Sequence, residues 1–175
     1  MSGHEELTTR RLSLKRPVKG DIDAVLAIHG DPAACAHNPS DALATRAEAE
    51  ERYGHWDALW RRRGYGYWTV REHDAPAVLG FCGVKPMTLA GLPVLNLVYR
   101  LAPASWGRGL AGEAATAVAA WARAAEPGLS LIARIRPANL ASQRVALRAG
   151  LRRAEHLDEG GCDGLDWIHH RPAER

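Results

Sequence analysis

The sequence has little lysine, a single phenylalanine and no long apolar run. Lysine occurs only at Lys15, Lys19 and Lys85, so arginine supplies most of the 23 basic residues. The net charge of +3 and the pI of about 9.0 indicate a mild preference for small anionic ligands, and we expect no specific nucleic-acid binding. Because no segment is apolar enough for a signal sequence or a membrane span, we expect a cytoplasmic protein without a membrane partner.

The sequence also lacks the usual signatures of disulfides, metal sites and serine hydrolases. Its three cysteines, Cys35, Cys82 and Cys162, lie far apart, and an odd scattered set argues against a disulfide framework. Neither H-E-x-x-H nor G-x-S-x-G occurs. His169 and His170 adjoin on an expected strand, where neighbouring side chains point to opposite faces. We therefore expect no metal.

Hydrophobic periodicity predicts one α+β domain over residues 1–175. The expected helices are 21–29, 47–63, 110–125 and 139–150, with Asp21 and Asn139 as N-caps. The expected strands are 11–16, 65–72, 78–85, 94–101 and 129–136, followed by a hairpin within 152–171. Short turns separate the strands between 65 and 101, which indicates an antiparallel meander. The sheet should be mixed but mostly antiparallel, with about seven strands flanked by about four helices.

A glycine-rich stretch, SWGRGLAGEAA, follows the meander and begins the third expected helix. It places Gly107, Gly109 and Gly112 where unpaired N–H groups and the helix dipole bind anions. Glycine lets a ligand approach the backbone closely, so the loop predicts a diphosphate site. A Walker loop is excluded because no lysine follows the glycines. A dinucleotide loop should open a βαβαβ unit with a later acid, whereas the next strand ends at Arg136.

Two segments of the sequence resemble the GCN5-related N-acetyltransferase (GNAT) family, in particular its RimJ/RimL branch of ribosomal-protein N-terminal acetyltransferases. The first segment, 106–111, is similar to the motif Q/R-x-x-G-x-G/A, with Trp106 in place of the usual Gln or Arg. The second, 137–145 followed by 148–151, is similar to N-x-x-S-x-x-v…G-f. The order of elements extends the resemblance over nearly the whole chain, which implies a single domain with a GNAT-like fold.

The resemblance implies that acetyl-CoA is the cosubstrate and that no metal is needed. Backbone groups of Tyr99, Arg100 and Leu101 would pair with the pantetheine arm where two strands separate, and Asn139 would contact the same arm. Ser142, in the serine position of the second motif, is the candidate acid for the leaving thiolate. Its alternative role is a hydroxyl satisfied by the local backbone.

The same resemblance assigns the pyrophosphate to the glycine loop. The residues expected to form this part of the site are Trp106, Gly107, Arg108, Gly109, Leu110, Ala111 and Gly112. Among them Arg108 is well placed to screen phosphate charge.

The predicted function is transfer of an acetyl group to a primary amine, either a protein N-terminal α-amino group or a small-molecule amine. Asn96 occupies a cleft-side position where a base would be useful but cannot act as one; His29, Glu48 and Asp166 are weak candidates. Two alternatives stay open: an acetyl-CoA-binding sensor or partner module without turnover, and an NADP-linked oxidoreductase using the same glycines. A homodimer is compatible with the family.

Overall fold

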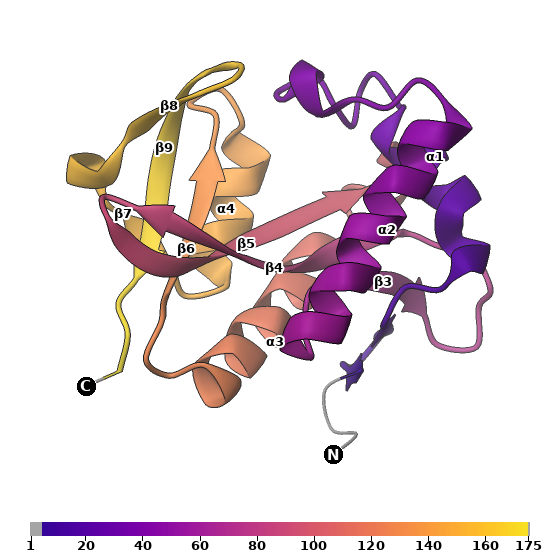
Figure 1. Ribbon diagram of the computed structural model, residues 1–175, viewed down its shortest axis with the longest axis horizontal. Coiled ribbons are helices and arrows are strands. Elements are labelled where there is room, and N and C mark those ends of the chain that lie inside the picture. The colour runs from indigo at the N-terminus through magenta and orange to yellow at the C-terminus, as the bar shows by residue number, and fades with distance from the viewer. Residues whose placement is uncertain (1–4, 175) are drawn as a thin grey trace.

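The computed structural model describes residues 5–174, whose strands form one continuous twisted sheet (Figure 1). The strands are β1 (Glu6–Thr8), β2 (Leu12–Lys15), β3 (Tyr67–Glu72), β4 (Gly80–Leu89), β5 (Leu92–Leu101), β6 (Ser130–Ile135), β7 (Arg152–Arg153), β8 (Glu159–Gly161) and β9 (Gly164–Arg171). The α-helices are α1 (Ile22–His29), α2 (Arg46–Arg63), α3 (Leu110–Ala125) and α4 (Leu140–Arg148). Four short 3₁₀ turns are η1 (Lys19–Asp21), η2 (Pro39–Asp41), η3 (Pro103–Ser105) and η4 (Glu155–Leu157).

The sheet has the order β1-β2-β3-β4-β5-β6-β9-β7, and β8 pairs with β9 beside this path. Its neighbours are antiparallel except β5 and β6, which run parallel. The helices α3 and α4 pack on one face, and α1 and α2 pack on the other (Figure 1). The predicted α+β class, antiparallel meander and four helices are confirmed, with nine strands in the described residues instead of about seven.

The alternation of side chains along β5 assigns each residue to one of two faces. Leu95, Leu97 and Leu101 point toward α3 and belong to the main buried cluster. Val94 points the other way into a smaller cluster with Ile132. Because β5 is covered on both sides, it is a central strand with two distinct surfaces.

Several boundaries differ from the sequence prediction. β4 continues past Lys85 through Pro86 to Leu89, because Pro86 pairs with β5 although it has no N–H to donate. The turn that follows is Ala90–Gly91, with φ of +49° and +78°. Two positive φ values are typical of the type I′ turn, whose twist matches a hairpin. β1 was not expected from the sequence; it pairs with β2 at the edge of the sheet.

Asp21 stands at the N-cap of α1, as predicted, but its side chain makes no capping bond to this helix. The buried carboxylate instead accepts hydrogen bonds from the Val18 N–H at 3.1 Å, the Thr69 hydroxyl at 2.8 Å and Arg71 at 2.5 Å. These bonds join η1 to β3, so Asp21 fastens the α1 side of the molecule to the sheet. The side chain of Asp21 thus bonds to the distant strand β3 and not to the N–H groups of the neighbouring helix α1.

Within residues 5–174, no helix combines the length and the apolar character needed to cross a bilayer. The same part of the chain contains no group of three or more His, Cys, Asp or Glu side chains suited to a metal ion. Cys35 and Cys82 are buried free thiols, and Cys162 is an exposed one.

We predict that Asp21→Ala lowers the free energy of unfolding by about 3 kcal/mol, because it strands a partly buried guanidinium and two other donors. Urea denaturation followed by tryptophan fluorescence would measure the change. Asp23→Ala is the matched control: that carboxylate is 82% exposed and pairs with Arg46 at the surface, so its loss should change little. Equal effects of the two substitutions would contradict the assigned role of Asp21.

Candidate active site

The central feature of the site is the separation of β5 and β6. Their pairing covers only Val94–Asn96 on β5 and Ser130–Ile132 on β6. Beyond these residues β5 runs on to Leu101 while β6 follows β9, so the two strands diverge (Figure 1). One edge of the second half of β5 is therefore left without a strand partner among the described residues.

Backbone groups along this half of β5 alternate in direction. The Ala102 N–H donates to the Leu79 carbonyl on the β4 side, so the groups of Arg100 also point toward β4. The backbone groups of Tyr99 and Leu101 consequently point into the gap between the diverging strands β5 and β6. The Trp106 indole N–H donates to the Leu101 carbonyl at 2.9 Å, which uses that acceptor and ties the loop to β5. The alternation thus directs the backbone groups of Arg100 toward β4, and its contact with the pantetheine arm stays a prediction.

The glycine loop lies at the end of β5, directly before the 16-residue helix α3. Gly107 and Gly109 have φ of +76° and +74°, in the left-handed region that favours glycine. The first backbone bond of the helix runs from the Glu113 N–H to the Gly109 carbonyl. None of the described residues accepts a hydrogen bond from the N–H groups of residues 107–112. The loop therefore presents unpaired donors at a helix N-terminus, as an anion site requires.

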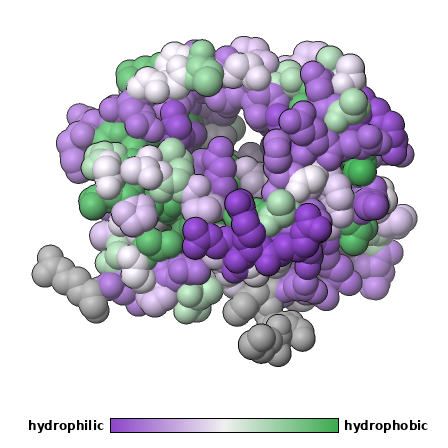
Figure 2. All heavy atoms as spheres, in the orientation of Figure 1, coloured by the Kyte–Doolittle hydropathy of each residue, from purple (hydrophilic) through white to green (hydrophobic). Residues whose placement is uncertain are grey.

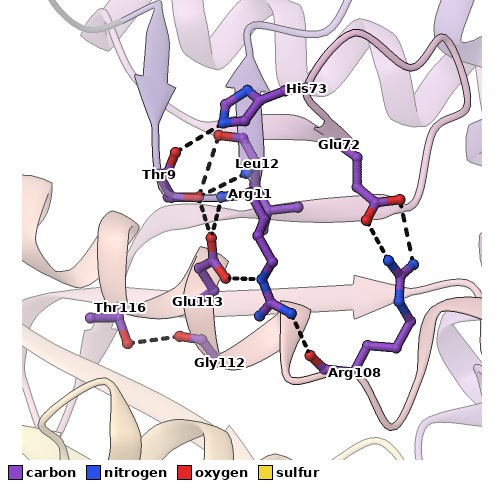
Figure 3. Close-up of polar contacts among 9 residues, drawn as sticks. All are labelled: Thr9, Arg11, Leu12, Glu72, His73, Arg108, Gly112, Glu113 and Thr116. Atoms are coloured by element: carbon purple, nitrogen blue, oxygen red, sulfur yellow. Dashed lines mark hydrogen bonds and ion pairs between the residues drawn. The ribbon is translucent and has the colours of Figure 1, made fainter.

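Two arginines distant in sequence flank this loop. A Cβ at Gly109 would lie 3.6 Å from Arg148 Nη1 and 3.7 Å from Arg11 Nη2, so both guanidinium groups border the same backbone. The Arg11 side chain also donates to the Arg108 carbonyl at 2.9 Å (Figure 3). A cavity of about 430 Å³ lies between α3, α4 and the β1–β2 turn, and Arg11, Arg148, Gly109 and Gly112 are among the residues that line it.

Glu113 orients Arg11. Its carboxylate accepts hydrogen bonds from the Arg11 N–H at 2.8 Å, from Arg11 Nε at 2.6 Å and from the Thr9 hydroxyl at 2.6 Å (Figure 3). Burial on its own would raise the pKa of Glu113, but these hydrogen bonds and the Arg11 charge lower it. The ionised carboxylate therefore holds the β1–β2 turn against the first turn of α3.

Arg108 has a carboxylate partner that the sequence did not indicate, and its contact with phosphate stays a prediction. Its guanidinium forms an ion pair with Glu72 at the end of β3 (Figure 3), which neutralises the charge predicted to screen phosphate. Arg148 has no ion pair with any residue between 5 and 174. Arg11 and Arg148 border the same loop and are further candidates for the phosphate contact predicted for Arg108. Arg148 belongs to the second motif, so the sequence carried a signal for it; for Arg11 there was none.

The second motif forms the opposite wall of the gap. Asn139 caps α4 as predicted, because its side-chain oxygen accepts the Ser142 N–H at 3.0 Å. The Tyr99 hydroxyl donates to the Ser142 carbonyl at 2.7 Å, which fastens β5 to α4 across the gap. Burial raises the pKa of the Tyr99 phenol, so it stays protonated. No described residue is hydrogen-bonded to the Ser142 hydroxyl, which is half-buried beside the gap.

The other face of β5 carries the groups considered as bases. Burial, together with Arg100 and Arg52, lowers the pKa of His29 to about 3, so it is a very weak base. Glu48 caps α2 by accepting the N–H groups of Ala44 and Thr45, and these bonds lower its pKa. Both are engaged in local structure.

Asp166 and Asn96 complete this face. Asp166 is buried and pairs with Arg134 at 2.8 Å and Arg136 at 3.5 Å. Asn96 is 5% exposed, and its side-chain oxygen has no hydrogen-bond partner among the described residues. The structure therefore brings Asn96 to the point where β5 and β6 separate, and it leaves none of the expected bases unpaired.

Comparison with known proteins agrees with this geometry. Residues 11–152 match the family described as acetyltransferase (GNAT) domain. YkkB of Bacillus subtilis, an uncharacterized protein, is 33% identical over 97 residues, which span 53% of this chain and 56% of that protein. This chain therefore aligns with little more than half of the curated relative.

Solved structures extend the likeness of fold to nearly the whole chain. An acetyltransferase from Agrobacterium tumefaciens has a TM-score of 0.81 at 22% identity, covering 97% of this chain and 95% of its own. RimL, a ribosomal L7/L12 α-N-protein acetyltransferase solved with coenzyme A, has a TM-score of 0.78 at 14% identity, covering 97% and 98%. The chain belongs to the GNAT family, a family of acetyl-CoA-dependent acetyltransferases.

We predict that Arg148→Gln raises the dissociation constant of acetyl-CoA about tenfold, because it removes a charge-assisted contact to phosphate. Isothermal titration calorimetry would measure the change, which should shrink as salt concentration rises. Arg144→Gln, an exposed position on the same helix, is the control and should bind as the unaltered protein does. Unchanged affinity in Arg148→Gln would remove this arginine from the phosphate site.

Proposed function

We propose that this protein transfers the acetyl group of acetyl-CoA to a primary amine. The observation that supports the proposal is the unpaired edge of β5 leading into a loop of unpaired N–H groups. An extended pantetheine arm suits the first, and a pyrophosphate suits the second. The residues present fit the cosubstrate, because the guanidinium groups of Arg11 and Arg148 border the loop, and Arg148 forms no ion pair with any other described residue.

A thioester supplies an acyl group that is already activated. The protein therefore has to orient the pantetheine arm, polarise the thioester carbonyl and protonate the leaving sulfur. The N–H of Tyr99 or Leu101 faces the gap and can donate to the thioester oxygen. Asn139, held as the cap of α4, is assigned to the pantetheine arm by its side-chain N–H₂. Ser142 is assigned as the proton donor to the leaving sulfur, since its hydroxyl borders the gap and is not used by the protein.

The acceptor is an amine that needs little help with deprotonation. An α-amino group titrates near about 8, against about 10.4 for lysine, so a water relay is sufficient where no carboxylate is unpaired. This argument favours an α-amino group, on a protein N-terminus as in the RimJ/RimL branch or on a small molecule. A single domain over residues 1–175, a homodimer and a cytoplasmic location stay predictions.

One competing function keeps some support. A sensor or partner module that binds acetyl-CoA without turnover would also have Asn96 where a base is useful. The oxidoreductase alternative loses its support, because a dinucleotide fold needs several adjacent parallel strands and this sheet has one parallel pair.

Transfer can be distinguished from binding alone by measuring the release of coenzyme A thiol with a panel of candidate acceptors. The panel contains peptides, aminoglycosides, polyamines and amino acids. Release with none of them, combined with tight acetyl-CoA binding, would favour the sensor. A melting-temperature shift with NADPH and none with acetyl-CoA would overturn the proposal itself.

We predict that Ser142→Ala lowers kcat about 100-fold while the KM of either substrate changes little, because an acid acts on the departing sulfur and not on binding. Steady-state thiol release with a good amine acceptor measures both constants. Ser13→Ala, a half-buried serine on β2 whose hydroxyl donates to Glu6, is the matched control and should leave both unchanged. An unchanged kcat in Ser142→Ala would return this serine to a structural role.

A further inference from the structure

Two arginines on the α1 and α2 face of β5 converge on one carboxylate. Arg100 leaves β5 on the face opposite α3, and its Nη1 lies 2.8 Å from Asp41 Oδ2. Arg52 on α2 reaches the same group from the other side, with Nη2 3.0 Å from Asp41 Oδ1. Each carboxylate oxygen therefore has its own guanidinium, which is the arrangement of a carboxylate receptor.

The three members of this cluster are held very differently. Arg100 and Arg52 belong to a central strand and a long helix, and their side chains are 15% and 21% exposed. Asp41 ends the short turn η2 in the connection between α1 and α2, and its side chain is 48% exposed. Long connections of this kind move more readily than the elements they join. The two cations are fixed, and the anion is the replaceable partner.

The cluster carries an excess of positive charge. Asp41 is the one carboxylate among the described residues that forms an ion pair with either arginine. The other neighbours are neutral: the Cys35 thiol lies 3.5 Å from Arg100, and the pKa of the buried phenol of Tyr67 is raised. Two poorly hydrated guanidinium groups cannot be left without a counter-ion at low cost. Any ligand that displaces Asp41 must therefore bring an anion of its own.

A contact next to this cluster joins two distant parts of the chain. The Ser40 hydroxyl donates to Asp163 Oδ2 at 2.6 Å, and the Ser40 N–H donates to Oδ1 at 3.1 Å. This contact joins η2 to the tip of the β8–β9 hairpin, and Arg136 supports the tip by donating to the carbonyls of Asp163 and Leu165. The surface is hollowed between the two halves of the molecule below this bridge (Figure 2). A hollow bridged in this way suits a small acceptor better than the surface of a folded protein.

We propose that Arg52 and Arg100 form a binding site for the carboxylate of the acceptor, a site that Asp41 fills in this structure. The preferred acceptor is then a small amine that carries its own carboxylate, such as a free α-amino acid. This inference rests on the proposed acetyl transfer and narrows its substrate class. Arg100 is next to Tyr99, whose backbone lines the gap for the thioester, so a carboxylate held there brings a nearby amine toward the acyl group.

The test compares glycine, alanine, serine and methionine with their carboxamides in the thiol-release assay. The unaltered protein should show a kcat/KM at least about tenfold higher for each acid than for its amide. Arg100→Gln should bring that ratio close to one, mainly through a higher KM for the acids. Arg46→Gln, an exposed arginine on α2 with surface partners only, is the matched control and should keep the ratio. Absence of a preference, or a ratio that survives Arg100→Gln, would overturn the inference.

The substitution Asp41→Asn tests whether Asp41 is an anion that the acceptor replaces or a residue that only holds the α1–α2 connection in place. If Asp41 competes with the acceptor, the substitution lowers the KM of the acids several-fold and leaves that of the amides unchanged. If Asp41 only fastens the α1–α2 connection, KM rises for both sets and the carboxylate site is rejected. Peptide amides with an acidic first residue form a further arm. Preference for these over the free amino acids would contradict the small-acceptor assignment.

A binding measurement keeps the two proposals distinguishable. Calorimetric titration of glycine and glycinamide into the protein saturated with acetyl-CoA reports the carboxylate site without turnover. Selective binding of glycine that is lost in Arg100→Gln supports the site even if no thiol is released, in which case only the transfer proposal fails. Equal binding of the two compounds, together with normal transfer to other amines, overturns the site alone.

Discussion

β5 and β6 are paired for only three residues on each strand, and the rest of the active site depends on their separation. A sheet interior does not tolerate unpaired backbone groups without cost, because each buried donor or acceptor needs a partner. Here the backbone groups of Tyr99 and the Leu101 N–H are directed into the gap between β5 and β6, and the Tyr99 hydroxyl bond to Ser142 links β5 to α4 across it. The gap is therefore part of the folded structure, and an extended ligand lying in it can pair with the open edge of β5.

The two faces of β5 carry two separate groups of arginine side chains. On the α3 and α4 face, the glycine loop, Arg11 and Arg148 surround the cavity that we propose as the pyrophosphate site. On the α1 and α2 face, Arg52 and Arg100 surround Asp41. In both places a carboxylate orients or occupies guanidinium groups whose planar donors suit oxyanions better than a lysine ammonium does. The arginine-rich, lysine-poor composition thus has a counterpart in the architecture of the site.

Elements with strong local signals were predictable. The β3–β5 meander, the apolar face of α3 and the Asn139 cap depend on neighbours in sequence, and they agree with the structure. Predictions were incomplete where a distant partner competed with a local one. The Asp21 side chain bonds to β3 and leaves the first turn of α1 without a side-chain cap, and Arg108 pairs with Glu72 at the end of β3. β1 was missed because three residues at a sheet edge carry almost no periodicity.

By itself the sequence determined the order of elements, the glycine loop and the family, because these depend on side-chain periodicity and on residues a few positions apart. Only the tertiary structure decided which backbone groups face the gap, and it alone joined Arg11 to the loop and Arg52 to Arg100. Such pairings arise from the packing of elements remote in the chain, and no spacing within the sequence encodes them. The family follows from local chemistry, whereas the acceptor side of the site depends on how the α1–α2 connection folds over β5.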